Sequence, residues 1–488
     1  MTRTLPYRTT AVAFAAAASL CSNASAQREA GAEPPAKIAL TGATVITVSG
    51  DELENATVLV EYGRIKAVGD EVELPYDAVE YDLEGKVVMP GIFHAHAPEG
   101  MDVPNEALPV TPFLHARDAL DPSKLFFENS LRRGITTVHV LPGDNTVIGG
   151  MGMAVRPIGL SVRDMTVVQD ASMKMSVSPR SGYDRMRQMS ELRRAFFDLG
   201  IDRERLAEEK YEESLDDEPI EVGPEKAREL GLEMLEDGDY EATQVDLIRT
   251  LRGDLGTWVY ASRAGDVVNA KRFVEEHELL DNTVFVIGTE AHKAAPALAE
   301  AGRPVIVSPE LFHRERDPFS GELVETFVPA TLHEAGVEFS LLPNPSGSLA
   351  EAEPTYQAAL AARNGVPRSV ALRSITLNPA NAMGMGEDYG SIEEGKVANL
   401  VVLSGDPLDF GSVVEHVFID GILAYERTRD PRIQRLLDLA KRHADAEAED
   451  QPEPEDDEDA PADEDGSDED GSDDAQSDSD DDGEGDAE

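Results

Sequence analysis

The hydrophobic pattern of the chain changes its period twice. Between residues 37 and 90, short apolar runs separated by Gly, Asp and Asn predict strands without intervening helices. From 91 to 389, strand-like runs alternate with stretches whose apolar residues recur at helical spacing, and short strands return at 390–427. We therefore expect an α/β protein, namely a (β/α)8 barrel of TIM type with a small composite β-sheet domain built from both chain ends.

Within the barrel segment the alternation can be followed element by element. Strands are expected at 135–141, 257–260, 283–287, 304–307 and 337–342, and helices at 122–133, 266–277, 291–301, 330–335 and 350–364. Residues 182–254 interrupt this series with a mostly helical pattern that carries charges on its outer faces. We interpret this stretch as a helical insertion that serves as a lid or as an interface.

The first residues have the pattern of a secretory signal. Basic residues precede an apolar run at 11–20, and the small residues at 24–26 form a cleavage site. The run is too short to span a bilayer, and no other stretch is long and apolar enough for a membrane helix. Residues 1–26 are thus expected to be a signal peptide, and the protein to be exported, periplasmic or extracellular. Cys21, the only cysteine, lies inside this signal, which excludes disulfides and thiolate metal ligands in the mature chain.

The negative charge is concentrated at the C-terminus. Of the net charge of −53, residues 445–488 supply −25 and contain no Lys or Arg. A segment this polar cannot offset its ordering entropy by burial, so 444–488 is expected to be an acidic disordered tail that follows an amphipathic helix at 430–443. The remaining 444 residues still carry −28, which argues against nucleic acid as a partner.

The first candidate functional residues follow the junction near residue 90. Here the sequence runs Val87-Val-Met-Pro-Gly-Ile-Phe-His-Ala-His-Ala-Pro98. Residues i and i+2 of a strand point to one side, so His94 and His96 can aim at one point, as two metal ligands must. The alternative is two histidines packed in the interior of the barrel.

Motifs along the chain together carry a family resemblance. They are Val88-Met-Pro-Gly-Ile, Arg133-Gly-Ile-Thr-Thr-Val, Ile148-Gly-Gly-Met-Gly, Gly288-Thr-Glu-Ala-His-Lys, Thr376-Leu-Asn-Pro-Ala and Gly390-Ser-Ile-Glu-Glu-Gly-Lys-Val-Ala-Asn-Leu-Val-Val. In order and spacing the chain resembles the amidohydrolase superfamily, in particular the imidazolonepropionase-related exported amidohydrolases. The resemblance implies hydrolysis of C–N bonds of small molecules, in which a divalent metal activates a water molecule. Zinc is the metal that we expect before any other. The resemblance also implies a homo-oligomer, or a hetero-oligomer with a related amidohydrolase.

The metal ligands of the family are mostly replaced in this sequence. On the pattern of the first strand, His94 stands at an Asp position, His96 at the first His, and Pro98 at the second His. The later ligand positions fall on Ser262, Ile287 and, depending on register, Pro343 or Asn344. Two hypotheses follow: a metal-dependent hydrolase with an altered site, or a non-catalytic member that binds a ligand or pairs with an active relative. We favour loss or strong weakening of hydrolysis, because a catalytic zinc needs about three protein ligands.

Several further residues are candidates under these hypotheses. His139 and His292 could complete a metal site with His94 and His96, although a packed histidine and a polar helix-start residue are the simpler interpretations. Lys174 is either a modified bridging lysine or an ion-pair partner, and Glu290 either an acid/base group or a helix cap. The candidates for substrate contacts are His115, Asn344 and, in the Gly-rich loop expected at 142–152, Gly150.

Overall fold

The computed structural model describes residues 37–103, 107–215, 222–344, 348 and 350–449, without the side chains of 443–449. The expected signal peptide and residues 450–488 of the expected acidic tail lie outside the described residues. The chain divides into two compact units, Met1–Ile433 and Gln434–Glu488. Everything below concerns the first unit unless stated.

One mixed sheet contains strands from both chain ends. Its order is β18-β17-β16-β5-β1-β2-β3, with β4 paired to β1. The strands are β1 (Lys37–Ile46), β2 (Glu52–Glu61), β3 (Arg64–Gly69), β4 (Val79–Asp82), β5 (Val87–Pro90), β16 (Leu400–Leu403), β17 (Val414–Ile419) and β18 (Ile422–Glu426). The two ends meet where β5 pairs antiparallel with β16, Pro90 opposite Leu400 and Val87 opposite Leu403. This shared sheet belongs to the same compact unit as the barrel strands.

The barrel strands form a second sheet of eight, in the order β15-β12-β11-β10-β9-β8-β7-β6. They are β6 (Ile92–His94), β7 (Ile135–Val140), β8 (Ile148–Val155), β9 (Thr166–Ser176), β10 (Gly256–Ala261), β11 (Thr283–Ile287), β12 (Val305–Val307) and β15 (Phe339–Ser340). Strand β8 runs antiparallel to β7 and β9, whereas all the other neighbours are parallel. The fold is therefore α/β and barrel-like, but it departs from eight parallel β/α units.

The antiparallel strand corrects the loop expected at 142–152. Glycines suggested a loop, yet Gly149, Gly150 and Gly152 lie within β8. A Cβ on Gly150 would come within 2.4 Å of the Leu114 carbonyl oxygen, and Gly150 has a φ of +105°. These glycines allow close backbone approach inside a strand, a role that composition does not distinguish from a turn.

A short segment connects the two edges of the curled sheet. The N–H of Leu341, directly after β15, donates to the Ser374 carbonyl over 2.9 Å, and the N–H of Phe93 in β6 donates to the Ile375 carbonyl over 3.0 Å. The edge strands thus have hydrogen-bond partners in residues that are not themselves part of the sheet. Edge groups are satisfied in this way without a regular eighth parallel pairing.

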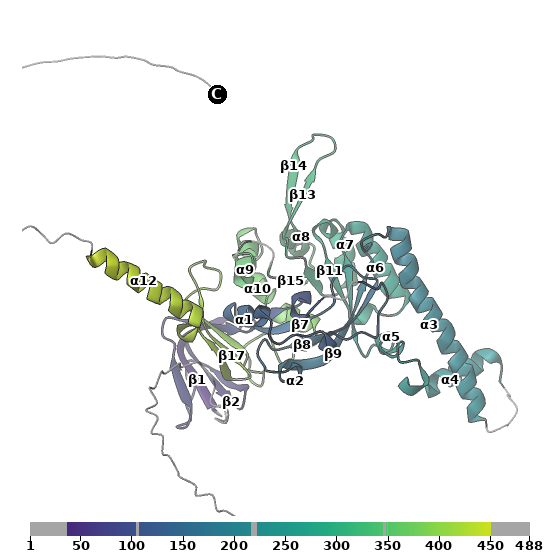
Figure 1. The fold of residues 1–488 in the computed structure, drawn as a ribbon, viewed down its shortest axis with the longest axis horizontal. Helices are drawn as coiled ribbons and strands as arrows, with labels where there is room; N and C mark the ends of the chain where they lie inside the picture. The colour runs from purple at the N-terminus through teal and green to yellow at the C-terminus, as the bar shows by residue number, and fades with distance from the viewer. Residues whose placement is uncertain (1–36, 104–106, 216–221, 345–347, 349, 450–488) are drawn as a thin grey trace, which may run out of the picture. The chain divides into compact units, whose positions relative to one another are not determined.

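The helices follow the expected alternation. They are α1 (Leu125–Arg132), α2 (Val162–Met165), α3 (Arg185–Ser214), α4 (Pro224–Met234), α5 (Val245–Leu251), α6 (Ala264–Glu276), α7 (Ala295–Ala301), α8 (Val328–Glu334), α9 (Pro354–Arg363), α10 (Arg368–Arg373), α11 (Leu377–Ala382) and α12 (Pro431–Glu449). Helices α3 to α5 fall within 182–254, between β9 and β10 (Figure 1). Helix α12 continues past residue 443 to Glu449, beyond the expected start of the tail. No helix among the described residues has the length and apolar character needed to cross a membrane.

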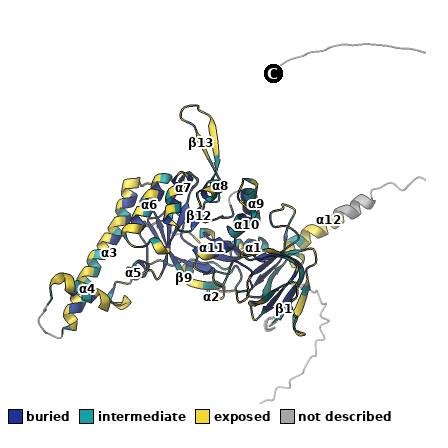
Figure 2. Ribbon diagram, turned by 180° about the vertical axis from the view of Figure 1, so that it is seen from behind, coloured by how far each residue is buried: buried dark blue, intermediate teal, exposed yellow. Residues whose placement is uncertain are grey.

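Burial separates the barrel from its periphery. Strands β7, β8 and β11 are buried along their whole length, whereas α3 and α4 are largely exposed (Figure 2). A hairpin of β13 (Phe312–Arg316) and β14 (Leu323–Phe327) was not expected from the sequence. The polar residues buried at the barrel centre are therefore the candidates for a functional site.

Candidate functional site

A fully buried lysine is the centre of a polar cluster in the barrel. Lys174 lies on β9, opposite Gly150 of β8 and Trp258 of β10, and its side chain has 0% exposure. Its Nζ lies 2.6 Å from Asp144 Oδ1 and 3.0 Å from His96 Nε2. The three residues come from β9, from the loop after β7 and from the residues after β6. They meet because the carboxyl ends of parallel strands share one edge of the sheet.

The electrostatics of this cluster fix its protonation states. Burial, reinforced by the charge of Lys174, lowers the pKa of His96 to about 3, so its Nε2 is an unprotonated acceptor at neutral pH. Burial acts to raise the pKa of Asp144, but the attraction of Lys174 outweighs it and leaves that pKa below its ordinary value. The side chain of Asp144 is still 36% exposed and is the part of the cluster open to solvent.

His94 and His96 have different surroundings. The ring of His94 packs at 5.8 Å between centroids against Phe126 of α1, and its Nδ1 has no hydrogen-bond partner among the described residues. Burial and the nearby Arg133 lower the pKa of His94 to about 3. Strand β6 ends at His94, so the two-residue alternation that would align both rings does not extend to His96.

The other two histidine candidates have their own partners. His139 Nδ1 lies 3.0 Å from the Ala95 carbonyl and its Nε2 lies 2.8 Å from Ser172 Oγ, so both ring nitrogens are used. Burial lowers the pKa of His139 to about 4. His292 lies on the 3-10 helix Thr289–Ala294, with Nδ1 2.6 Å from the Thr289 carbonyl and its ring against His313.

The substrate-contact candidates are held in structural interactions. His115 lies between two carboxylates, with Nδ1 3.3 Å from Asp170 Oδ1 and Nε2 3.2 Å from Asp246 Oδ2. It thereby ties the loop before the 3-10 helix Ala116–Asp118 to β9 and α5. Asn344 donates from its side-chain amide to Glu351 Oε2 over 3.0 Å. Gly150, opposite Lys174 in the ladder, borders the cluster through backbone alone.

A second buried network lies at the ends of β9 and β10. Asp266 Oδ2 accepts hydrogen bonds from Ser178 Oγ over 2.9 Å and from Ser262 Oγ over 3.2 Å. Arg185 Nε donates to Asp266 Oδ1 over 2.7 Å. Tyr260 links the two networks: its ring centroid lies 5.6 Å from Lys174 Nζ, and it hydrogen-bonds with Ser262. Burial raises the pKa of Tyr260, which keeps its hydroxyl protonated.

Sequence reasoning missed two acids of these networks. Asp144 follows a buried strand in Pro142-Gly-Asp-Asn, and Asp266 occupies the first turn of α6. A strand end and a helix start are the usual positions of site residues in such folds. Both positions were therefore available as signals, but neither acid stands at a ligand position of the family pattern.

The donor set does not fit a divalent metal ion. Among the described residues, no group of three or more His, Cys, Asp and Glu side chains is placed to hold one. At the barrel centre the ammonium of Lys174 bonds to both of the nearest donors, His96 and Asp144. A zinc site needs about three protein ligands. The positive charge of Lys174, which is bonded to two of the donors, also repels a second cation at this position.

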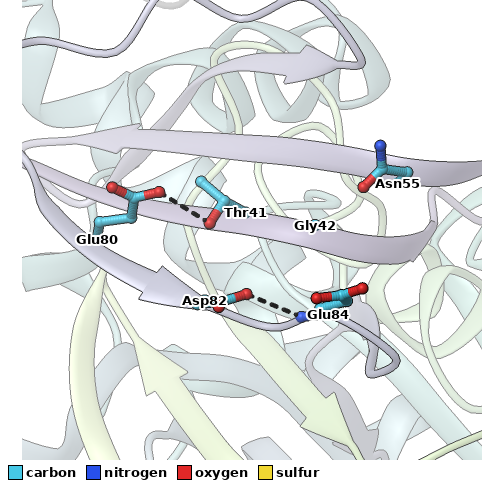
Figure 3. Close-up of a pocket in the computed structure, with 6 residues that line it drawn as sticks. All are labelled: Thr41, Gly42, Asn55, Glu80, Asp82 and Glu84. Atoms are coloured by element: carbon cyan, nitrogen blue, oxygen red, sulfur yellow. Dashed lines mark hydrogen bonds between the residues drawn. The ribbon is translucent and has the colours of Figure 1, made fainter.

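A surface hollow lies elsewhere, on the shared sheet. It has a volume of about 650 Å³ and is lined by Thr41, Gly42, Asn55, Glu80, Asp82 and Glu84 (Figure 3). Thr41 Oγ1 donates to Glu80 Oε1 over 3.1 Å, and the Glu84 N–H donates to Asp82 Oδ1 over 3.2 Å. These bonds join four of the six lining residues, and the hollow contains none of the residues of the barrel cluster.

Fold and site define a barrel-like α/β scaffold with a polar cluster at the carboxyl ends of the strands. The family model "Amidohydrolase family" matches residues 329–424. A crystal structure of an amidohydrolase from Thermotoga maritima MSB8 is 30% identical, with a TM-score of 0.65 over 80% of this chain and 100% of that one. The chain belongs to the amidohydrolase superfamily.

Two curated relatives extend the comparison. Amidohydrolase tasK of Hapsidospora irregularis is 27% identical over 433 residues, which are 80% of this chain and 41% of that protein. N-substituted formamide deformylase of Arthrobacter pascens is 34% identical over 154 residues, which are 27% of this chain and 28% of that protein. The chain thus spans less than half the length of both relatives.

Proposed function

We propose that this protein is an amidohydrolase-family member in which metal-dependent hydrolysis of C–N bonds is lost or strongly weakened, and whose barrel centre binds a small molecule. The proposal rests on the position of Lys174 Nζ, which lies 2.6 Å from Asp144 Oδ1 and 3.0 Å from His96 Nε2. An ammonium group holds the donors that a metal would need.

The replaced ligand positions support this proposal. Ser262 donates to Asp266 as part of the second network, and Ile287 is fully buried in apolar surroundings. Pro343 has no side-chain donor atom. Family members generally use divalent metals, and among the described residues none of these positions supplies a third ligand beside His96 and Asp144.

The cluster suits a polar ligand group at the barrel mouth. Lys174 supplies a buried positive charge, whereas the half-exposed Asp144 marks the approach from solvent. A small molecule with a neutral carbonyl group suits this arrangement, because the ionised Asp144 would repel a carboxylate, and Tyr260 is an additional hydroxyl donor. Tyr260 and Lys174 can orient such a group without breaking a bond in it.

The second candidate is a hydrolase that binds zinc through His94, His96 and either His139 or His292. Family membership and the C–N hydrolase relatives favour it. The two candidates differ in metal binding, which can be measured directly.

The experiment is metal analysis of the purified chain after mild chelation and re-addition of zinc. We expect well below one equivalent of zinc, and the same value for His96→Ala and for the control His333→Ala on α8. One equivalent or more in the wild type, lost in His96→Ala and kept in His333→Ala, would refute the proposal. After zinc has been added back, the protein should also leave N-formyl amines and dipeptides unhydrolysed.

Export and assembly are further parts of the proposal. Residues 1–26 have the pattern of a signal peptide, so expression in a bacterium with intact mass analysis of the exported protein should give a chain that begins at Gln27. An oligomer with itself or with a related amidohydrolase would be detected by light scattering and by co-purification. An uncleaved chain retained in the cytoplasm would contradict export.

A further inference from the structure

A second cavity lies away from the barrel cluster, between α1, α9 and the shared sheet. Its volume is about 290 Å³, at the lower end of the range of small-molecule sites. Helix α1 contributes Arg132, α9 contributes Tyr356, and β16 with the turn after it contributes Leu403 and Phe410. Figure 1 shows α1 and α9 on the side of the barrel that faces the shared sheet. His96, Asp144 and Lys174 are not part of its lining.

Two aromatic rings form part of the wall. Tyr356 and Phe410 lie with their ring centroids 5.1 Å apart at an interplanar angle of 56°. Phe410 is 70% exposed although it is large and apolar. Leu403, Leu408 and Val413 complete an apolar surface around this pair. Such a wall favours an aromatic or apolar ligand body.

Arg132 of the lining and its neighbour Arg133 have acidic partners. Arg132 Nε donates to Asp430 Oδ2 over 2.6 Å, and Arg133 Nε pairs with Glu353 Oε1 over 3.2 Å. The guanidinium of Arg427 makes no hydrogen bond or ion pair with another described residue, and it lines the cavity. The half-buried Arg427 is therefore a cation of the cavity lining that has no acidic partner among the described residues.

Two acids of the lining must be weighed against this arginine. Glu353 is the partner of Arg133. Asp409 also lines the cavity, exposed to solvent, and its Oδ1 accepts the Gly411 N–H over 3.0 Å. That bond fixes the turn and leaves Asp409 unpaired with any arginine. A ligand ammonium group could approach Asp409. Aromatic acids with an amino group and those without one therefore both offer the carboxylate and the ring that this cavity would bind.

We propose that this cavity is a binding site for a small aromatic carboxylate, with Arg427 holding the carboxylate and Tyr356 and Phe410 holding the ring. Guanidinium and carboxylate match in a two-bond geometry, and partial burial strengthens these bonds. The site is independent of the barrel cluster and of the function proposed for it.

The test is isothermal titration of the full chain with 3-phenylpropionate and with L-phenylalanine. We expect saturable binding of at least one of them at one equivalent per chain. Arg427→Gln should weaken it at least tenfold, and 3-phenylpropanol, which lacks the carboxylate, should bind at least tenfold more weakly than 3-phenylpropionate.

Two variants make the outcome decisive. Arg429→Gln is the matched control, because Arg429 is 73% exposed, pairs with Glu426 and does not line the cavity; it should bind as the wild type does. Phe410→Ala removes an exposed ring without disturbing the core and should also weaken binding. The proposal fails if neither acid binds saturably, or if Arg427→Gln binds as tightly as Arg429→Gln.

Discussion

The Nζ of Lys174 lies 2.6 Å from Oδ1 of Asp144, joining the interior strand β9 to the loop after β7. The lysine has no exposed surface, whereas the aspartate keeps 36%. This asymmetry decides what happens when either partner is removed, because a buried charge that loses its counter-ion cannot recover hydration and an exposed one can.

Removing Asp144 should therefore cost more stability than removing Lys174. We expect Asp144→Asn to lower the free energy of unfolding by about 3 kcal/mol, since Lys174 loses its carboxylate partner in a dry site. Lys174→Met, which keeps the volume, should cost about 1 kcal/mol because Asp144 can rehydrate. Urea denaturation measures both values. Equal costs, or the reverse order, would show that Lys174 is not confined as the structure indicates.

His94 should make the protein sensitive to acid. Its pKa is lowered from 6.5 to about 3 in the fold, so the unfolded chain takes up a proton that the folded chain refuses. The stability held by the neutral ring is complete above pH 6.5 and is lost as the pH falls towards 3, by up to about 1.4 kcal/mol per unit. His94→Leu should remove the contribution of this one histidine to the slope of unfolding free energy against pH. It should change the unfolding free energy at pH 7.5 by less than about 1 kcal/mol, because the His94 Nδ1 has no hydrogen bond to lose. Urea midpoints between pH 7.5 and 5 measure the slope, and parallel profiles for the two proteins would contradict the assignment.

Two helical glycines should respond oppositely to alanine. A Cβ on Gly231 of α4 would lie 1.8 Å from the Ala207 carbonyl oxygen of α3, whereas a Cβ on Gly200 of α3 meets nothing within 4 Å. Gly231→Ala should force the helices apart and cost about 1–3 kcal/mol. Gly200→Ala should stabilise α3 by about 0.5–1 kcal/mol through helix propensity. Hydrogen exchange of the α4 amides reports the effect locally; unchanged protection in Gly231→Ala would mean that the two helices are not packed this closely.

Asp266 should matter more than the serines that bond to it. It is fully buried and accepts hydrogen bonds from Ser178, Ser262 and Arg185. Asp266→Asn replaces one acceptor oxygen by a donor and should cost about 2–3 kcal/mol, whereas Ser262→Ala loses one bond and should cost about 1 kcal/mol. Thermal unfolding of the two variants gives the comparison. A larger loss in Ser262→Ala would place the weight of the network on the serine instead.

The sequence by itself determined the α/β class and the family. Apolar periodicity and turn residues set the strand–helix alternation, because these are local properties of the chain. The match of motifs at 88–92 and 390–402 to one family indicated the superfamily to which the chain belongs. It also predicted Pro98, Ser262 and Ile287 at ligand positions of the family, since a residue type is visible without a fold.

Only the tertiary structure decided the site. The glycines of β8 predict a loop when the sequence stands alone, because the closeness of Leu114 to Gly150 arises between segments that are far apart in sequence. The end of β6 at His94 separates two histidines that a longer strand would have aligned. Lys174 finds Asp144 and His96 because three strand ends converge at one edge of the sheet, and neither distance nor desolvation is written in the local sequence.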